Sequence, residues 1–373
     1  MRVVFVGTEI PDYCIEFAGM MSDSCDALLC IPDRYRSPDR PKPNSKLEIA
    51  WLPWPRQRDL RNIFFTRNVS KIIRDWNPDI VHFLNESNVW NWILARALKP
   101  TPIITTVHDI TYHPGDFSSR RVPRFFANAL IRQGDAIIVH GEVLRAAAAR
   151  LLPMSPAQIF VVPLNTPHLP SIPDFKSERQ HTYANRNDGL FRILFFGRIY
   201  EYKGLRYLLE AMPLVRANVP NIQLIIAGEG DDISKYSAFA KDISYIKLLN
   251  HFIPRSEVAQ LFVEADLLAL PYIEASQSGP LMMAMAFGLP VVATEVGEIS
   301  SVVRSTRMGL VVPPRDKIAL ADAITKVALD EGLRRQLSEN AKQAMSSDYS
   351  REAISSRVLH IYEGLINQLT RVH

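Results

Sequence analysis

The sequence of 373 residues is poor in cysteine. Its three cysteines, Cys14, Cys25 and Cys30, all lie near the N-terminus in apolar surroundings. An odd number of such residues does not suit a disulfide framework. We therefore expect reduced thiols in a hydrophobic core and a reducing compartment, the cytoplasm.

Long hydrophobic runs are also lacking. No stretch approaches the ~18 apolar residues that a membrane-spanning helix needs. The opening MRVVFVG reaches Gly7 and Thr8 before the apolar region of a signal peptide can form. We expect a chain that is not threaded through a membrane, although it could rest on the inner membrane face as a peripheral protein.

Strong charge of one sign is absent, because the net charge is only +4. This value fits an anionic substrate or an anionic membrane surface, and it is too small to indicate nucleic acid. Zinc-ligand spacing, a Walker phosphate loop, a serine-nucleophile elbow and nucleic-acid motifs are missing as well. These absences predict neither a metal site nor a nucleic-acid partner.

What the sequence does contain is two series of alternating strands and helices. Short β-branched runs extend from Val3–Val6 to Phe160–Val162 and again from Arg192–Phe196 to Leu310–Val312, with helical segments between them. This alternation predicts an α/β protein with two doubly wound parallel sheets. The length suits two domains of about 150 to 200 residues each.

The expected boundaries follow from changes in composition. We predict a Rossmann-like domain at 1–165, a Pro-, Asn- and Ser-rich linker at 166–189 and a second Rossmann-like domain at 190–345. The tail at 346–373 predicts an amphipathic helix that packs back on the first domain. Its apolar residues recur at spacings of three and four: Ile354, Val358, Ile361, Tyr362 and Leu365.

Two cations follow the first strand of the second series. The buried strand Phe191–Phe196 is predicted to end at Gly197, and Arg198 and Lys203 come next, before Gly204 opens a helix. Arginine and lysine at the carboxyl end of a parallel strand predict a site for a diphosphate. The alternative is a pair of surface cations.

A second candidate stretch, EASQSG, begins about seventy residues further on. Glu274 can accept a hydrogen bond from a sugar hydroxyl, and Ser278, Gly279, Pro280 and Leu281 are predicted to begin a helix whose amides face donor oxygens. A capped buried helix start is the plainer interpretation, and both can hold. We expect the two stretches to lie side by side and to hold a nucleotide-sugar.

Weaker signals come from single glycines at strand ends. Gly228, with Glu229 after it, follows the strand Gln223–Ala227, and Gly7 follows the first strand. Either glycine can allow close approach of a ligand to the backbone, and either can be an ordinary turn residue.

His108 ends the predicted strand Ile103–Val107 in the first domain. At that position it is expected to bond the transferred sugar or its leaving oxygen, with a structural role as the alternative. The long polar loop at 111–121 is assigned to the acceptor, because such loops are often functional.

The segment Pro55–Trp76 is basic and carries apolar residues. It could form a patch resting on anionic lipid, or a surface helix whose apolar face covers the sheet. The residues considered for the patch are Arg58, Arg61, Ile63, Phe64, Arg67, Lys71, Ile72, Ile73, Arg74 and Trp76, with Trp51, Trp54 and the basic loop Arg34–Lys46.

Several of these motifs occur in a familiar order. GR-x4-KG after a strand, IIAGEG, FIPRSEVAQLFVEADLLALPY, and EASQSG followed by MAMAFGLPVVATEVGEISSVV resemble the GT4 family of retaining glycosyltransferases, most strongly over Phe191–Pro313. The resemblance implies a GT-B fold, in which two Rossmann-like domains face a central cleft and a C-terminal helix crosses back to the first domain.

The same resemblance assigns roles to residues. It implies that Arg198 and Lys203 bind the donor diphosphate, that His108 contacts the transferred sugar, and that Ile253 and Arg255 help to frame the nucleotide base.

At this point the chain departs from the two-glutamate motif of the family. Met283 replaces its second glutamate, and the first falls on Ala275 with Glu274 beside it. We interpret this as altered ribose contact in a subgroup with an acidic residue before ASQSG.

By this resemblance the chain moves a sugar, with retention and without a metal or cofactor, from a UDP- or GDP-sugar substrate to a glycan or lipid-linked acceptor. The leaving diphosphate would help to deprotonate the acceptor during front-face attack. The expected role is cell-surface or exported polysaccharide biosynthesis. The alternatives are a nucleotide-sugar 2-epimerase, which shares the fold, and a non-catalytic scaffold that binds a nucleotide-sugar.

Overall fold

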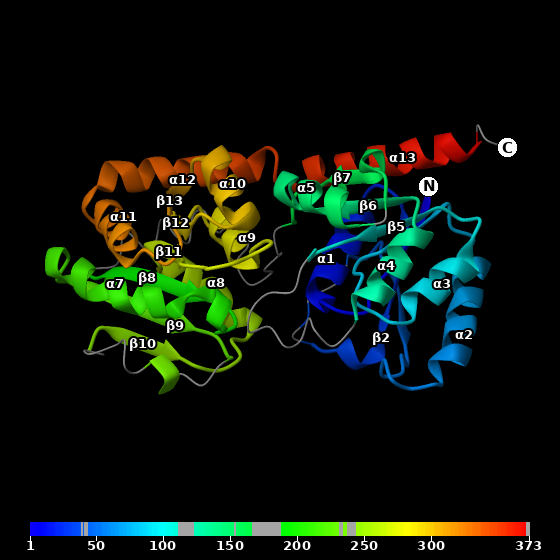
Figure 1. Cartoon of the computed structure of the whole chain (residues 1–373), viewed down its shortest axis with the longest axis horizontal. Coiled ribbons are helices and arrows are strands. Elements are labelled where there is room, and N and C mark those ends of the chain that lie inside the picture. Colours follow the sequence, from blue (N-terminus) through cyan, green and yellow to red (C-terminus); the bar gives the residue numbers. More distant parts are fainter. Residues whose placement is uncertain are drawn as a thin grey trace. The chain divides into compact units, whose positions relative to one another are not determined.

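The computed structural model describes residues 1–38, 40, 44–110, 123–152, 154–165, 188–230, 234–236 and 244–370. The chain divides into two compact units (Figure 1). Unit 1 contains the described residues up to 165 together with 349–370, and unit 2 contains those at 188–348. The acceptor loop expected at 111–121 and residues 166–187 of the expected linker lie outside the described residues.

Unit 1 is built on a seven-stranded sheet in which all paired strands are parallel. The strands are β1 (Arg2–Val6), β2 (Asp26–Pro32), β3 (Glu48–Leu52), β4 (Ile80–Phe83), β5 (Ile103–Thr106), β6 (Ala136–Val139) and β7 (Ile159–Val161). Their spatial order is β3-β2-β1-β4-β5-β6-β7. The helices are α1 (Pro11–Met21), α2 (Asn62–Asp75), α3 (Asn91–Leu98), α4 (Arg124–Gln133) and α5 (Glu142–Leu151), with short 3-10 turns at Asp33–Tyr35 and Pro156–Gln158.

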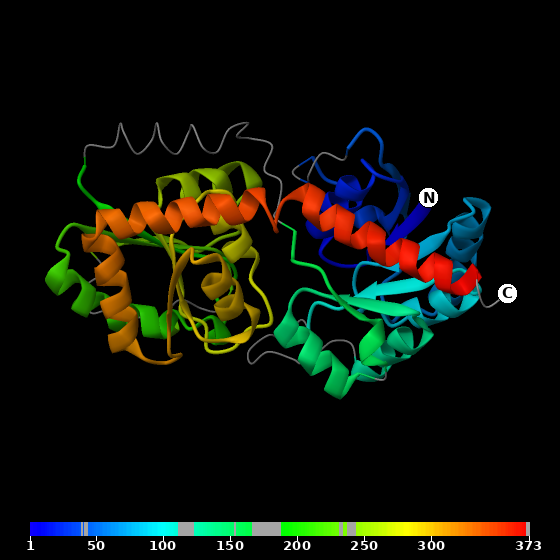
Figure 2. The same cartoon turned by 90° about the horizontal axis from the view of Figure 1, so that it is seen from above.

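Alternate residues of the strands face opposite sides of this sheet, as the period of two requires. Val3 and Phe5 of β1 join a core with α1, whereas Val4 and Val6 join a core with α2 and α3. The last helix, α13 (Arg351–Thr370), lies along the α1 side (Figures 1 and 2). The five apolar residues expected to anchor it are all buried there, which confirms that the C-terminal helix packs on the first unit.

Unit 2 is a six-stranded parallel sheet. Its strands are β8 (Phe191–Phe196), β9 (Ile222–Ala227), β10 (Ile246–Leu249), β11 (Leu267–Leu270), β12 (Val291–Thr294) and β13 (Gly309–Val312), in the order β10-β9-β8-β11-β12-β13. The helical elements are a 3-10 turn at Glu201–Lys203 and the helices α7 (Leu205–Asn218), α8 (Arg255–Glu264), α9 (Gly279–Ala286), α10 (Gly297–Thr306), α11 (Lys317–Leu329) and α12 (Glu331–Ser346).

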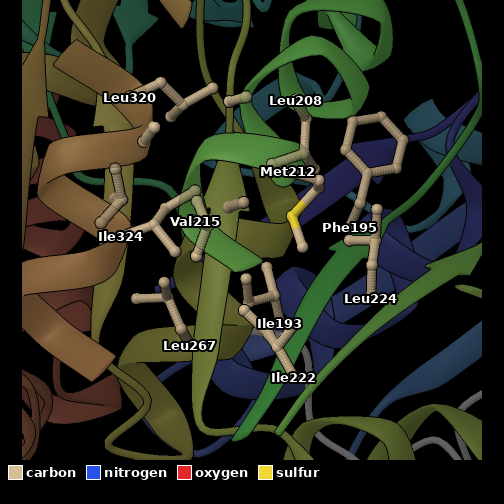
Figure 3. Close-up of a cluster of buried hydrophobic side chains, with 14 of the residues drawn as sticks. Ile193, Phe195, Leu208, Met212, Val215, Ile222, Leu224, Leu267, Leu320 and Ile324 are labelled. Carbon is tan, nitrogen blue, oxygen red and sulfur yellow. The ribbon is translucent and has the colours of Figure 1, made fainter. Parts of the chain in front are cut away.

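One core of unit 2 lies between the sheet and the helices α7 and α11 (Figure 3). Ile193 and Phe195 of β8 contribute to it from the sheet, Met212 from α7 and Ile324 from α11, and all are buried. These apolar contacts hold β8 and the beginning of α7 in a fixed relation, and the segment between them carries two of the candidate site residues.

Each sheet has a point at which the strand order reverses. In unit 1 this point is β1/β4, and in unit 2 it is β8/β11. Ligands of open parallel sheets bind outside the carboxyl ends of the strands at such a point. The fold therefore directs attention to the loops after β8 and β11, and to those after β1 and β4.

The cysteines of unit 1 are free thiols, and Cys14 and Cys30 are buried. Burial raises the pKa of the Cys30 thiol to about 12.

Among the helices that the structure describes, none has both the length and the apolar character of a membrane-spanning segment.

Unit 1 contains a buried group of histidines beneath α1 and α13. His82 Nδ1 lies 2.7 Å from the hydroxyl of Tyr362, and its Nε2 lies 2.8 Å from Thr106 Oγ1. His140 Nε2 lies 3.3 Å from Nδ1 of His108. Burial, with a smaller contribution from His108, lowers the pKa of His82 and of His140 to about 3.

We expect unit 1 to lose stability in mild acid because of this cluster. The folded pKa values of His82 and His140 lie below the unfolded value of about 6.5. The two neutral histidines therefore contribute fully to the free energy of unfolding above about pH 6.5, and this contribution is lost as the pH falls towards about 3. The loss is about 1.4 kcal/mol per pH unit for each histidine. Urea unfolding of the wild type and His140→Gln at pH 7, 6 and 5 should give a shallower pH dependence for the variant.

The chain offers a selective probe for this measurement. All five tryptophans, at residues 51, 54, 76, 90 and 92, belong to unit 1, so their fluorescence follows that unit. Equal slopes for the wild type and the variant would contradict the assignment of the pH dependence to this cluster.

Candidate functional site

The loops after β8 and β11 are locked together at the point where the strand order reverses. The backbone N–H of Ile273 donates to the carbonyl of Tyr202 at 2.8 Å. Gly204 has a φ of 68° and lies so close to the neighbouring loop that a Cβ atom would sit 1.9 Å from the carbonyl oxygen of Pro271. Only glycine fits this left-handed position, and its absence of a side chain brings the two candidate stretches side by side.

Lys203 lies between these loops and the beginning of α9. Its Nζ is 5.1 Å from the centroid of the Tyr272 ring and would be 2.9 Å from a Cβ atom built on Gly197. The same point on Gly197 is 3.6 Å from Cγ of Pro280. Although Lys203 is charged, only 8% of it is exposed.

The charged form of the Lys203 side chain is disfavoured at this position. Burial and, to a smaller extent, the nearby charge of Arg198 lower its pKa to about 8, whereas Tyr200 opposes the shift. Arg198 itself is exposed, with its guanidinium carbon 5.3 Å from the centroid of the Tyr200 ring. Two cations held close together, one of them buried, favour an anion between or beside them.

The first turn of α9 adds to the same region. Ser278 is the N-cap, and its hydroxyl accepts a hydrogen bond from the Leu281 N–H at 3.3 Å. Gly279 and Pro280 form the first turn, and a Cβ on Gly279 would meet no heavy atom within 4 Å. The positive end of the helix dipole therefore lies beside Lys203. Met283, one turn later, is buried.

Glu274 lies on the loop after β11 and is half-buried. The next residues of that loop contact the start of α10, because Gly297 packs against the carbonyl of Ala275 and the Glu298 N–H donates to the carbonyl of Ser276 at 3.1 Å. Glu298 is a carboxylate only 4% exposed that our sequence interpretation did not single out. It lies in the first turn of α10, and the signal available in the sequence was an acidic residue next to a glycine shortly after the strand Val291–Ala293.

The loop after β9 packs on the loop after β8. Ile199 N–H donates to the carbonyl of Glu229 at 2.8 Å, and a Cβ on Gly228 would lie 2.2 Å from the carbonyl oxygen of Gly197. The glycine at 228 is thus required by the neighbouring backbone. Glu229 is exposed.

The residues predicted to frame a base follow β10. Ile253 is buried, and Arg255 is half-buried as the first residue of α8. The ring of Phe252 between them and the strand is 64% exposed. An exposed aromatic side chain at the carboxyl edge of a sheet offers a surface on which a planar ring can stack.

The two candidates of unit 1 have partners inside that unit. A Cβ on Gly7 would lie 2.5 Å from Sγ of Cys14, so this glycine allows α1 to pack close to β1. His108 is 6% exposed, with Nε2 at 2.9 Å from the Leu84 carbonyl and Nδ1 at 3.3 Å from His140. A contact between a sugar and a ring nitrogen of His108 would have to replace one of these interactions.

The structure thus collects the unit 2 candidates at the carboxyl edge of one sheet, whereas Gly7 and His108 lie at that edge of the other. In the part of the chain that is described, His, Cys, Asp and Glu side chains form no group of three that could hold a metal ion.

Gly204→Ala should separate the two loops. Its methyl group would overlap the carbonyl of Pro271, so we expect a loss of at least about 2 kcal/mol in the free energy of unfolding of unit 2. Differential scanning calorimetry can measure this change. Gly279→Ala is the matched control, because it adds the same atom nearby in open space; equal melting temperatures for the two variants would refute the packing argument.

Lys203→Met should make the ligand-free protein more stable at pH 7. The folded pKa of about 8 lies below the unfolded value of 10.5, so burial of the charge destabilises the fold below pH 8, and this penalty decreases as the pH rises towards 10.5. The gain is on the order of 3 kcal/mol. Calorimetry at pH 7 and at about pH 9.5 should show a larger gain at the lower pH, whereas destabilisation at both would contradict the prediction.

Comparison with known proteins finds a matching family model for a segment of each unit. Residues 191–330 match the family model described as Glycosyl transferases group 1, and residues 13–164 match that of Glycosyltransferase Family 4. A phosphatidyl-myo-inositol mannosyltransferase from Mycobacterium leprae is 31% identical over 183 residues, which span 48% of this chain and 48% of that protein.

Solved structures agree in fold. Sucrose-phosphate synthase from Thermosynechococcus elongatus is 18% identical with a TM-score of 0.77, over 99% of this chain and 100% of that one. Anabaena HepE in complex with UDP-glucose is 16% identical with a TM-score of 0.70, over 98% and 99%. The expected GT-B fold is confirmed, and each unit contains a segment that matches a glycosyltransferase family model.

Proposed function

We propose that this protein is a retaining glycosyltransferase that moves a sugar from a nucleotide-sugar to an acceptor hydroxyl. The observation that carries the proposal is the position of Lys203, a buried cation beside the positive end of α9 at the β8/β11 reversal. Such a position suits the diphosphate of a donor, because the anion would offset the cost of burying the ammonium group.

The proposed reaction needs charge stabilisation more than a catalytic base. The bond between the sugar's anomeric carbon and the diphosphate oxygen breaks, and a bond from the acceptor oxygen to the same face of that carbon forms. The acceptor proton passes to the leaving diphosphate. Lys203 and Arg198 stabilise the negative charge that grows on the diphosphate, and positioning supplies most of the remaining rate enhancement. We infer that the reaction proceeds without a metal or cofactor.

The other unit 2 residues take roles around this anion. Glu274 would accept hydrogen bonds from donor hydroxyls, and Gly279 at the start of α9 leaves room for donor oxygens. Ile253 and Arg255 would border the base, with the exposed ring of Phe252 beside them. The acidic residue before ASQSG, with Met283 in place of an acid, would mark a subgroup with altered ribose contact.

We propose a UDP- or GDP-sugar as the donor and a glycan or lipid-linked sugar as the acceptor. HepE was solved with UDP-glucose, which supports the donor class, and the Mycobacterium leprae relative is named a phosphatidyl-myo-inositol mannosyltransferase, which supports a lipid-linked acceptor. In this proposal residues 190–345 form the donor domain and 1–165 the acceptor-side domain. The setting is cell-surface or exported polysaccharide biosynthesis in the cytoplasm or at the inner membrane face.

The proposal assigns no chemical step to His108. The family resemblance gives it a contact with the transferred sugar, but both of its ring nitrogens already have partners within unit 1. His108 can orient a neighbouring backbone group as well as a ligand, and the proposal does not depend on which of the two it does.

A panel of UDP-, GDP- and ADP-sugars tests the donor site directly. A sugar nucleotide at 100 times its dissociation constant should stabilise the protein by about 2.7 kcal/mol, which calorimetry or a thermal-shift assay can detect. Lys203→Met and Arg198→Met should each weaken binding by tenfold or more, because a charged contact to the diphosphate is lost. Affinity for the bound nucleotide should also fall as the pH rises above about 8, where Lys203 loses its proton.

Lys326→Met is the matched control, because Lys326 is an exposed cation on α11 of the same unit. Absence of any shift across the panel, or equal binding by the control and the Lys203 variant, would overturn the donor site. Product analysis separates the transferase from its two alternatives. A 2-epimerase would change the sugar nucleotide without any acceptor. A scaffold would form no product, and its biological role would survive both Lys203→Met and Arg198→Met.

A further inference from the structure

Large apolar side chains are exposed at the beginning of α2 and just before it. Leu60 and Phe64 are each 74% exposed and Ile63 is 56% exposed, and the three lie within five residues of one another. Side chains of this size at such exposure form a protruding apolar tip, which we call the α2 tip. An exposed apolar group rimmed by polar residues commonly marks a surface that meets a membrane or another protein.

The α2 tip continues into a stripe of cations. Arg67, Lys71 and Arg74 follow it at helical spacings and are exposed on the same side, whereas Val69 and Ile73 on the opposite side are buried against the sheet. Arg74 also donates to the carbonyl of Ala97 at the end of α3.

The charge around the tip is strongly positive. Six arginines and lysines and one carboxylate lie between residues 56 and 74. That carboxylate, Asp59, is already paired with Arg61 at 2.6 Å. Arg56 and Arg58 are exposed on the segment before the helix. An apolar tip surrounded by cations complements a surface that offers hydrocarbon beneath anionic headgroups.

The structure corrects part of the patch expected from the sequence. Trp54 is only 6% exposed and packs on Phe65, and Ile73 is fully buried. Trp51 and Trp76 are partly buried and pack against the cores of unit 1. These residues belong to the interior, whereas the tip and the cationic stripe are exposed.

The segment before α2 is tied to the carboxyl edge of the unit 1 sheet. The side-chain amide of Gln57 donates to Glu9 Oε1 and to the carbonyl of Ser87, both at 3.2 Å, and Trp90 Nε1 donates to the carbonyl of Gln57 at 2.7 Å. Glu9 follows β1 and Ser87 follows β4, the strands at which the order of this sheet reverses. A surface that holds the tip would therefore lie near the edge where this sheet is expected to bind ligands.

We propose that the α2 tip inserts into an anionic lipid bilayer, with Arg67 and Lys71 on the headgroups. A second inference depends on the proposed glycosyl transfer: the acceptor is a lipid-linked molecule held at that surface. Leu60, Ile63 and Phe64 enter the headgroup and acyl boundary, and the cations give the preference for anionic lipid.

Co-sedimentation with vesicles tests the docking in the absence of donor and acceptor. Vesicles of phosphatidylcholine with about one third phosphatidylglycerol should bind the protein, phosphatidylcholine alone should bind it far less, and high salt should weaken the interaction. The double variants Ile63→Ser/Phe64→Ser and Arg67→Gln/Lys71→Gln should each lower the partition coefficient roughly tenfold.

The control is Ile318→Ser/Lys326→Gln, which removes one exposed apolar and one exposed basic side chain from α11 of unit 2 and should leave binding unchanged. Equal binding to both vesicle types, or equal losses in the control, would overturn the proposal. So would a wild-type dimer in gel filtration that Ile63→Ser/Phe64→Ser dissociates, because a second copy would then cover the tip.

This outcome is separable from the proposed transfer reaction. The tip variants should bind UDP as the wild type does, because they leave unit 2 intact. Vesicle binding without nucleotide binding would refute the proposed transferase and support the docking surface. Nucleotide binding without vesicle binding would refute the docking surface and leave the proposed transferase standing. If both hold, a lipid-linked acceptor should be used several-fold less well by the tip variants, with a soluble acceptor unaffected.

Discussion

The site depends on the contact between the loops after β8 and β11. Gly204 beneath the carbonyl of Pro271 and the hydrogen bond from Ile273 to Tyr202 fix the two chain segments against each other. Lys203 is part of the first segment, and Tyr272 and the start of α9 belong to the second. Their proximity is therefore a property of the backbone, which makes the cation a rigid element before any ligand is present.

This rigidity has an electrostatic cost. Lys203 is held in a place where burial and Arg198 both disfavour its charge, and its pKa of about 8 records that conflict. A bound anion resolves it, because its opposite charge replaces the stabilisation that water gives to an exposed ammonium group. A protein that maximised its own stability would place a neutral residue here, so the choice of lysine is better explained by binding than by folding.

The sequence predicted the strands well, because parallel strands buried on both faces are short β-branched runs, and it predicted the α13 anchor from its helical spacing. The helix α1 left no such signal, since residues from Tyr13 to Met21 are almost all buried and it has no polar face. The sequence also predicted that the stretches after β8 and β11 would lie side by side, because parallel strands of one sheet end at the same edge. The partners of Gly228 and His108 could not be predicted, because they come from segments distant in the chain, such as Gly197 and His140.

The points of strand-order reversal in the two sheets differ in chemistry. This difference supports the proposed placement of the donor in unit 2 and the acceptor in unit 1. At the unit 2 reversal lie Lys203, Arg198 and a helix start, all favourable to negative charge. At the unit 1 reversal Asn85 Oδ1 accepts from the Thr8 N–H at 2.9 Å and the Asn85 amide donates to Thr8 Oγ1 at 2.9 Å, and the carboxylates there belong to Glu9 and Glu86. Carboxylates can accept hydrogen bonds from the hydroxyls of a sugar acceptor, and they would repel a diphosphate. This difference in charge supports the proposal that the donor binds to unit 2.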